Sequence, residues 1–155
     1  MPDPTPTESA TLMRLVGRVE SRRVLRPAQD GPRMEISFSA ALTSGRLGSG
    51  SAACSFIGHL EPGGRYQWQG RGALFLSAGT VTTRSWGRGQ RQGNTIVYQG
   101  AMAFHAHTPS LDWLDGLQAS FEYVQDLASL EVTVHCQESP AFHNHLPQQK
   151  GISPC

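Results

Sequence analysis

The sequence predicts an all-β fold, an antiparallel barrel of eight to nine strands with one short helix before the last two strands. Apolar and polar residues alternate over many short segments, which is the pattern of half-buried strands. The 17 glycines and 10 prolines suit the frequent turns that such strands need. Glycine inside a strand often marks a bend that lets a sheet curl, and this favours a barrel over a β-sandwich. The interrupting residues are Gly17, Gly58, Gly70 and Gly100.

The length of 155 residues suits one domain. We expect residues 1–10 to be disordered, residues 11–138 to form the barrel, and residues 139–155 to form an irregular C-terminal tail. The first residues lack the basic and apolar regions of a signal peptide. No apolar run approaches the roughly 20 residues of a membrane span. We therefore expect a cytoplasmic protein without a membrane partner.

The strands follow in order along the chain. Alternation begins at Leu12, and a strong turn signal at residues 61–64 precedes the clearest alternating segment. Residues 43–50 and 87–94 are polar and rich in glycine, so both are expected to be loops. The further strands are expected over residues 33–42, 51–60, 66–77, 80–86, 95–107, 118–126 and 130–137.

One short segment carries a helical signal. Pro109 and Ser110 lead into Leu111, Trp113 and Leu114. Ser110 is expected to cap the first turn, because serine favours the position before a helix.

The alternation also assigns the two faces of the wall. Bulky apolar residues should point into the barrel, and polar residues should point out. The expected inward residues are Met34, Ile36, Phe38, Tyr66, Trp68, Tyr98 and Met102. The expected outward residues are Arg65, Gln67, His105 and His107.

Charge and cysteine content exclude several functions. The net charge is +1, Lys150 is the only lysine, and the arginines form no basic stripe, so no nucleic-acid partner is expected. Cys54, Cys136 and Cys155 show no zinc-binding spacing. Cys54 lies on an apolar face with Phe56, and we expect an inert buried thiol there.

Aromatic and sulfur-containing side chains on the inward face are the candidate ligand-binding residues. Small-molecule pockets are mostly apolar with a few polar groups, which buried phenols and indoles supply. Packing of a filled interior is the alternative for each of these residues. A cavity of several hundred Å³ would support a pocket, whereas a filled interior would favour an interaction module. The candidates are Tyr66, Trp68, Tyr98, Met102, Phe104, Phe121 and Tyr123.

Tyr98 and Glu122 are the two catalytic candidates. Glu122 lies between Phe121 and Tyr123, so a regular strand turns it to the opposite face. If that face were inward, burial would raise the pKa of the carboxyl group and suit it to acid–base catalysis. An outward, solvated Glu122 is the expected arrangement.

His105 and His107 are spaced to lie on one face of a strand. Two imidazoles with a carboxylate such as that of Asp112 can bind zinc, iron or copper. The parity of the strand places the pair outside the barrel, so no metal and no cofactor are expected. Solvent exposure or a subunit contact is the preferred interpretation of the pair.

The hairpin LEPGGRYQW at residues 60–68, the strand and helix FHAHTPSLDWLDGL at 104–117, and two closing strands resemble small bacterial one-domain β-barrels of lipocalin-like shape. The barrels that the chain resembles include ligand carriers and allene-oxide-cyclase-like, cofactor-free cyclases. It implies that a small, largely apolar molecule binds inside the barrel, for a cyclase or isomerase reaction or for transport or sensing. The remaining alternative is an interaction module, a homodimer that uses outward residues such as Ala101 and Ala103.

Overall fold

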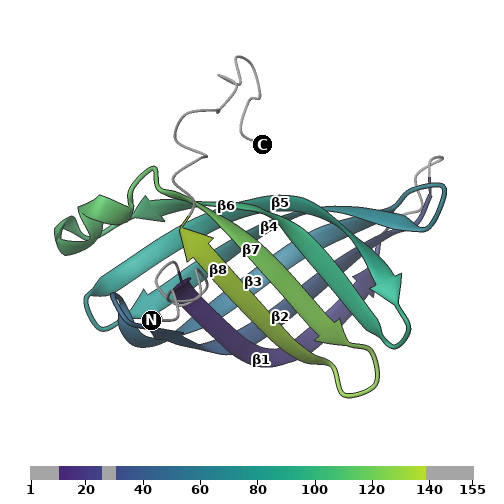
Figure 1. Cartoon of the computed structure of the whole chain (residues 1–155), viewed down its shortest axis with the longest axis horizontal. Coiled ribbons are helices and arrows are strands. Elements are labelled where there is room, and N and C mark those ends of the chain that lie inside the picture. Colours follow the sequence, from purple (N-terminus) through teal and green to yellow (C-terminus); the bar gives the residue numbers. More distant parts are fainter. Residues whose placement is uncertain (1–10, 26–30, 139–155) are drawn as a thin grey trace, which may run out of the picture.

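The computed structural model describes residues 11–25 and 31–138, which form one closed antiparallel barrel of eight strands (Figure 1). Each strand pairs with its neighbours in sequence, and β8 pairs with β1 to close the barrel. The predicted all-β fold is confirmed. The expectations for residues 1–10 and 139–155 lie outside the described residues. The strands are β1 (Thr11–Val24), β2 (Arg33–Ser44), β3 (Gly48–Leu60), β4 (Arg65–Leu76), β5 (Gly79–Gln92), β6 (Thr95–Ala106), β7 (Gln118–Asp126) and β8 (Glu131–Glu138).

Short turns explain why neighbouring strands pair in sequence order. Gly63 and Gly64 in the β3–β4 turn have φ angles of 95° and 82°, which glycine adopts without strain. In the β7–β8 turn, the Asp126 carboxylate accepts hydrogen bonds from the backbone N–H groups of Ala128 and Ser129, each at 2.8 Å. Both turns reverse the chain within a few residues and so place consecutive strands side by side.

The two predicted glycine-rich loops are wrong. Strand β5 continues through Gln92, so only Gly93 and Asn94 remain as the turn to β6. Residues 43–50 likewise belong mostly to β2 and β3. Pairing with the adjacent strand supplies the hydrogen bonds of these backbones, and polar side chains can face solvent there. Composition alone therefore underestimates strand length.

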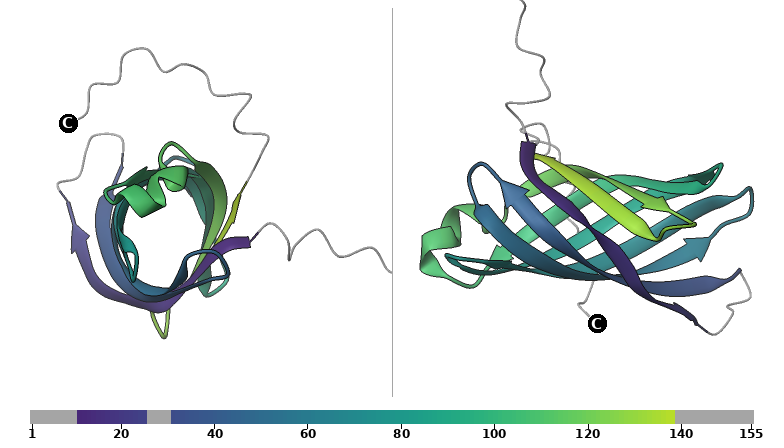
Figure 2. Two further views of the ribbon diagram at one scale, coloured as in Figure 1. Left: turned by 90° about the vertical axis from the view of Figure 1, so that its left-hand side faces the viewer. Right: turned by 90° about the horizontal axis from the view of Figure 1, so that it is seen from below.

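The segment between β6 and β7 is a 3₁₀ helix, η1 (Pro109–Leu114), rather than a longer helix capped by Ser110. Thr108 occupies the N-cap position and makes no side-chain cap hydrogen bond. The Ser110 hydroxyl instead donates to the Ala78 carbonyl oxygen at 3.5 Å. Leu111 and Leu114 are buried, and η1 lies at the rim of one end of the barrel (Figure 2). The segment therefore packs against the core at that end.

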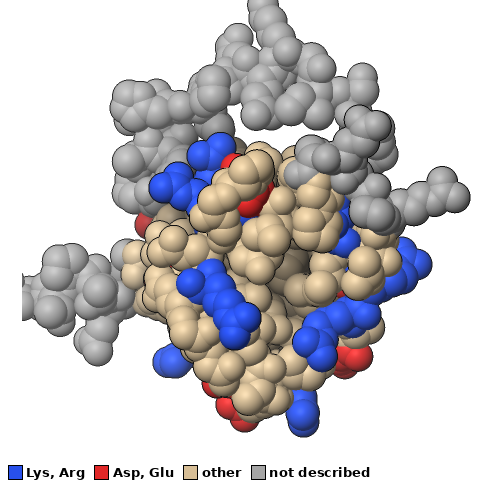
Figure 3. Space-filling view, turned by 90° about the vertical axis from the view of Figure 1, so that its right-hand side faces the viewer, with Lys and Arg blue, Asp and Glu red and all other residues tan. Residues whose placement is uncertain are grey.

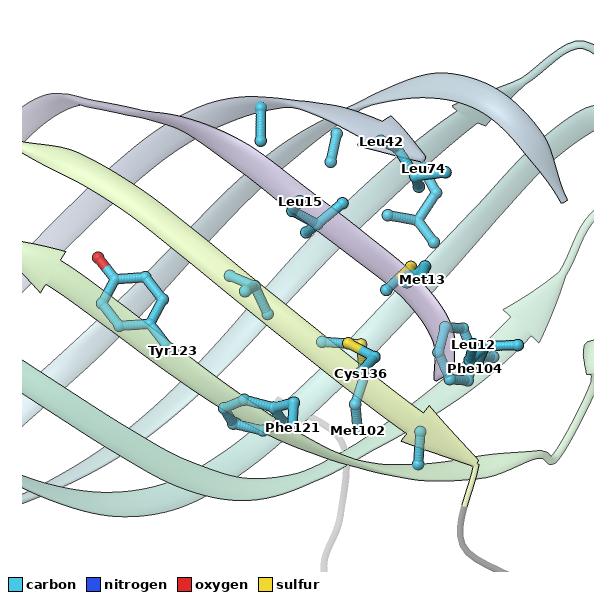
Figure 4. Packing of buried hydrophobic residues seen from close by; sticks show 14 of the residues in the cluster. Leu12, Met13, Leu15, Leu42, Leu74, Met102, Phe104, Phe121, Tyr123 and Cys136 are labelled. Atoms are coloured by element: carbon cyan, nitrogen blue, oxygen red, sulfur yellow. The ribbon is translucent and has the colours of Figure 1, made fainter. Parts of the chain in front are cut away.

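The predicted alternation of faces holds along most of the wall. Apolar side chains from all eight strands fill the interior (Figure 4). Ile36 and Phe38 are buried, whereas Arg65 and Gln67 are exposed. Met34 is the exception, because it lies one residue inside the start of β2 and is 39% exposed. The inward-facing residues of β2 thus continue beyond the packed core at the beginning of this strand.

Candidate functional site

Aromatic rings dominate the half of the interior that lies farther from η1. The Phe56 ring lies 5.2 Å from Trp68, 5.7 Å from Tyr98 and 5.3 Å from Tyr123, measured between ring centroids. These pairs are edge-to-face, the arrangement that ring quadrupoles favour. We call this group the aromatic cluster. Its members are Phe38, Phe56, Tyr66, Trp68, Tyr98, Phe121 and Tyr123.

The structure buries nearly all of the seven predicted ligand-binding residues. Tyr66 alone is partly exposed, and Phe104 lies toward η1, outside the aromatic cluster. Four of the seven border one small internal cavity of about 30 Å³. These four are Trp68, Met102, Phe121 and Tyr123.

This internal cavity is far smaller than the several hundred Å³ of an ordinary ligand pocket. It has room for about one water molecule. Gly70 helps to shape it, since a Cβ atom at this position would lie 2.8 Å from the Ser85 Oγ and 3.1 Å from the Trp68 Cζ3. In this conformation the interior is therefore a packed core with one small gap, which is the outcome expected of an interaction module rather than of a preformed ligand pocket.

Polar groups border the internal cavity. The hydroxyl-bearing residues Thr83 and Ser85 line it and are 5% and 9% exposed. The Trp68 Nε1 is buried and has no hydrogen-bond partner within residues 11–25 and 31–138. Burial without a partner is unfavourable for an N–H donor and is rare in folded proteins. The sequence predicted Trp68 as an inward residue but gave no sign that its N–H would lack a partner.

Burial keeps the interior phenols and thiols protonated. Desolvation raises the pKa of Tyr98 and of Tyr123 well above the usual range, and the Tyr123 hydroxyl donates to the Gln125 Oε1 at 2.9 Å. Desolvation also raises the pKa of Cys54 and of Cys136 to about 12. At neutral pH, Tyr98 and Tyr123 are therefore hydrogen-bonding groups rather than bases, and Cys54 is the inert thiol that the sequence predicts.

Glu122 lies outside the barrel. Its side chain is exposed, and the Gln99 Nε2 donates to its Oε2 at 3.0 Å on the outer wall. The regular alternation of β7 turns Phe121 and Tyr123 inward and Glu122 outward. The expected outward arrangement of Glu122 is therefore confirmed, and its carboxylate lies on the opposite side of the wall from the interior.

His105 and His107 also lie outside, as predicted. Their rings are 4.7 Å apart, but each binds a different neighbour. The His105 Nδ1 lies 2.8 Å from the Asp115 Oδ1, and the His107 Nε2 lies 2.9 Å from the Thr82 Oγ1. In the described part of the chain, no group of three candidate ligands surrounds a common point where a metal ion would bind.

The outer wall carries a groove of about 490 Å³ that the sequence did not indicate. Small residues of β2 and β3, among them Ala41 and Ser51, form its floor. Val16 and Phe75 border it and are 53% and 49% exposed. Ala101, expected as an outward dimer contact, pairs with the exposed Trp86 but is only 5% exposed within the single chain, and the dimer stays a prediction.

Comparisons with solved structures identify similar folds, whereas comparisons with family models and curated proteins find no match. None of the helices in the described ranges is long and apolar enough to span a membrane.

Three solved bacterial structures are similar in fold. A protein of unknown function from Clostridium acetobutylicum superposes with a TM-score of 0.68 and 14% identity, covering 84% of this chain and 97% of its own. A conserved protein of unknown function from Rhodopseudomonas palustris superposes with a TM-score of 0.69 and 13% sequence identity. The match covers 82% of this chain and 95% of that protein. A beta-barrel like protein from Acinetobacter baumannii superposes with a TM-score of 0.69 and 14% sequence identity. The match covers 90% of this chain and 100% of that protein. The chain is thus a small β-barrel like these bacterial proteins, and the lipocalin-like and allene-oxide-cyclase-like resemblance stays a prediction.

Proposed function

We propose that the barrel binds a small, largely apolar molecule in its aromatic half, held by a hydrogen bond from the Trp68 Nε1. The observation that carries this proposal is the Trp68 side chain, which lines the internal cavity and whose buried N–H has no hydrogen-bond partner in the described residues. Leaving a buried donor unpaired costs about 1–3 kcal/mol. A ligand oxygen that accepts this hydrogen bond would remove the cost, so the site favours an apolar molecule with a carbonyl group.

The ligand must enlarge the internal cavity when it binds. A volume of about 30 Å³ accommodates one polar group, and the hydrocarbon part must displace side chains. Met102 lines the internal cavity, and methionine adapts readily because its side chain is unbranched and flexible. Aromatic rings around the gap then supply the apolar contacts.

Transport or sensing is better supported than catalysis. The buried polar residues of the described ranges are Thr83, Ser85 and Gln125, and none of them is an acid or a base at neutral pH. Tyr98 is protonated, and Glu122 faces solvent. Shape alone can accelerate a cyclisation, but that requires a cavity large enough to fold the substrate.

Acetophenone tests the proposal, because it combines an aromatic ring with one carbonyl acceptor. We expect it to shift the Trp68 indole N–H signal in a ¹⁵N–¹H correlation spectrum, while the signals of the exposed Trp86 and Trp113 stay in place. The Trp68→Phe variant assigns the signal, since it removes one indole N–H. α-Methylstyrene is the matched control, because its shape is similar but it has no acceptor; we expect weaker binding.

Two results would overturn the proposal. Shifts confined to Trp86 and Trp113 would place acetophenone on the outer surface. A Trp68 indole signal that exchanges magnetisation with water and ignores every probe would identify the internal cavity as a site for one structural water.

Self-association is a second candidate function, and the outer groove favours it. Cross-strand pairing puts Val16, Ala41, Ser51 and Phe75 on one row, with the two small residues between the two large ones. Neighbouring strands lie about 4.8 Å apart, so a gap of roughly 14 Å separates the ends of the row. We propose that a second copy inserts its Phe75 into this gap and receives the first copy's Phe75 in return.

Charge complementarity supports a second copy as the occupant. Arg18 lines the groove, and the carboxylate of Glu20 on the same strand accepts a hydrogen bond from Ser39, another lining residue. A two-fold axis brings the same patch of both copies together, so Arg18 can face the partner's acidic group.

Sedimentation equilibrium tests whether the chain forms this dimer. We expect Phe75→Ser to dissociate the dimer. We expect Trp86→Ser to leave it intact, because Trp86 is an exposed aromatic residue outside the groove. A monomer at high protein concentration would exclude this candidate.

A further inference from the structure

We infer that the bound molecule is an amphipathic anion, such as an aromatic or aliphatic carboxylate, and that Arg22 binds its negative group at the open end of the barrel. This inference rests on the proposed function and adds the charge of the ligand. The open end is the end opposite η1, where β1, β3, β5 and β7 finish (Figure 1).

A β-bulge in β1 determines which arginine faces the barrel axis. Val19 pairs with Phe38 and Ser21 pairs with Ser37, so Glu20 is the extra residue. The parity of β1 therefore changes at Glu20, and Arg22 pairs with the inward-facing Ile36. Without the bulge, the neighbouring Arg23 would take the inward row. Bulges commonly re-aim side chains in this way beside functional sites.

The row that contains Arg22 leads directly to the aromatic cluster. Arg22 pairs with Ile36, and Ile36 pairs with Phe56 on β3. The Phe56 ring lies 5.2 Å from Trp68 between ring centroids. A molecule whose apolar part reaches the aromatic cluster can therefore keep its charged group at Arg22.

Apolar side chains at the open end complete the amphipathic character. Val24 and Met34 pair with each other on the inward row and are 71% and 39% exposed. Both lie beyond the packed core, next to Arg22. Exposed apolar side chains beside a cation match a ligand that has an apolar body and an acidic group.

Several arginine side chains gather at this end. Figure 3 shows blue arginine side chains around a largely uncharged centre, with red acidic side chains also on this face. Glu35 is engaged by Arg23 at 3.2 Å, and Asp126 accepts hydrogen bonds from its own turn. Arg22 has no ion pair with any residue of the described ranges and is available to an anion. The strands carry Arg22, Arg23, Arg33, Arg65, Arg88 and Arg91 near this end.

The test compares 3-phenylpropanoate with 3-phenylpropanamide, which share a shape and a carbonyl oxygen but differ in charge. We expect calorimetry to show tighter binding of the acid, and we expect both probes to shift the Trp68 indole signal. Arg22→Gln should weaken binding of the acid by up to about fivefold, the upper limit for an exposed ion pair. Binding of the amide should not change, and Arg22→Lys should restore part of the preference. Arg84→Gln is the matched control, because Arg84 is an exposed arginine on the outer wall.

The possible outcomes separate the two proposals. Equal binding of acid and amide, with both shifting the Trp68 signal, would overturn the anion inference and leave the proposed function standing. Failure of both probes to affect Trp68 would overturn the proposed function itself. Co-sedimentation with phosphatidylglycerol vesicles, together with no preference for the acid, would assign the arginines to a membrane surface instead.

Discussion

Replacement of Gly100 by alanine tests how the barrel wall is packed. Gly100 on β6 pairs directly with Gly87 on β5. A Cβ atom on Gly100 would lie 2.0 Å from the Trp86 carbonyl oxygen and 2.7 Å from the Gly87 Cα. Both are backbone atoms held by the sheet, so neither can rotate away as a side chain would.

The expected loss of stability is large for a single methyl group. Overpacking a core typically costs about 1–3 kcal/mol, and a clash with fixed backbone belongs at the upper end, about 3 kcal/mol. For a domain of this size, each kcal/mol shifts Tm by about 2–4 °C, so Gly100→Ala should lower Tm by roughly 6–12 °C.

Gly58→Ala is the matched control in a neighbouring part of the wall. A Cβ atom on Gly58 would lie 3.7 Å from the Tyr98 hydroxyl oxygen and 4.0 Å from the Met34 carbonyl oxygen, which are ordinary contacts. We expect a change within about 1 kcal/mol, in the stabilising direction, because alanine restricts the unfolded chain. Urea unfolding gives both free energies. A loss below about 1 kcal/mol for Gly100→Ala, or equal losses for the two variants, would refute the steric reasoning.

Two further predictions concern the buried polar groups. Tyr123→Phe should lower the free energy of unfolding by about 1–3 kcal/mol in urea titrations, because it leaves the buried Gln125 Oε1 without its donor. Tyr98→Phe serves as the comparison and should cost less, and equal losses would contradict this assignment. Stability should fall as pH rises from about 9 toward 12, since the folded state keeps Cys54 and Cys136 protonated to a pKa of about 12 while unfolded thiols ionise near 9. Denaturant titrations across that range check the sign, and a Cys54→Ala variant should reduce the slope.

Side-chain alternation was sufficient to predict most of the barrel. Tyr66, Trp68, Arg65 and Gln67 lie on the predicted faces, because a strand with one buried side must repeat every two residues. The hairpin through Gln92 was missed for the complementary reason. Cross-strand hydrogen bonds hold the backbone of this hairpin. Its side chains are mostly polar on both faces, so apolar and polar residues do not alternate there and the sequence pattern does not indicate a strand.

The candidate site depends on features that alternation does not encode. The small internal cavity arises where Gly70 lies beside Trp68 of the same strand and beside Ser85, which reaches Gly70 only through the register between β4 and β5. A register between strands is a tertiary property, and a slip of one residue would turn every side chain to the other face. The aromatic pattern therefore predicted which residues are inside and left open whether they pack against one another or line a pocket.

The bulge at Glu20 shows why the open end required a structure. Read without interruption, the alternation that places Val19 inside would also place Arg23 inside and Arg22 outside. The extra residue reverses both positions, so Arg23 pairs with Glu35 on the outer wall while Arg22 joins the row of Ile36. Nothing in the local sequence requires the bulge. β1 leaves β8 after the Arg18–Glu131 pair but continues beside β2, and a bulge increases local twist where a strand departs from a closed barrel. The geometry of barrel closure thus decides that Arg22, and not Arg23, lies on the inward row, so removing the charge of Arg22 rather than that of Arg23 is the perturbation that tests the inference.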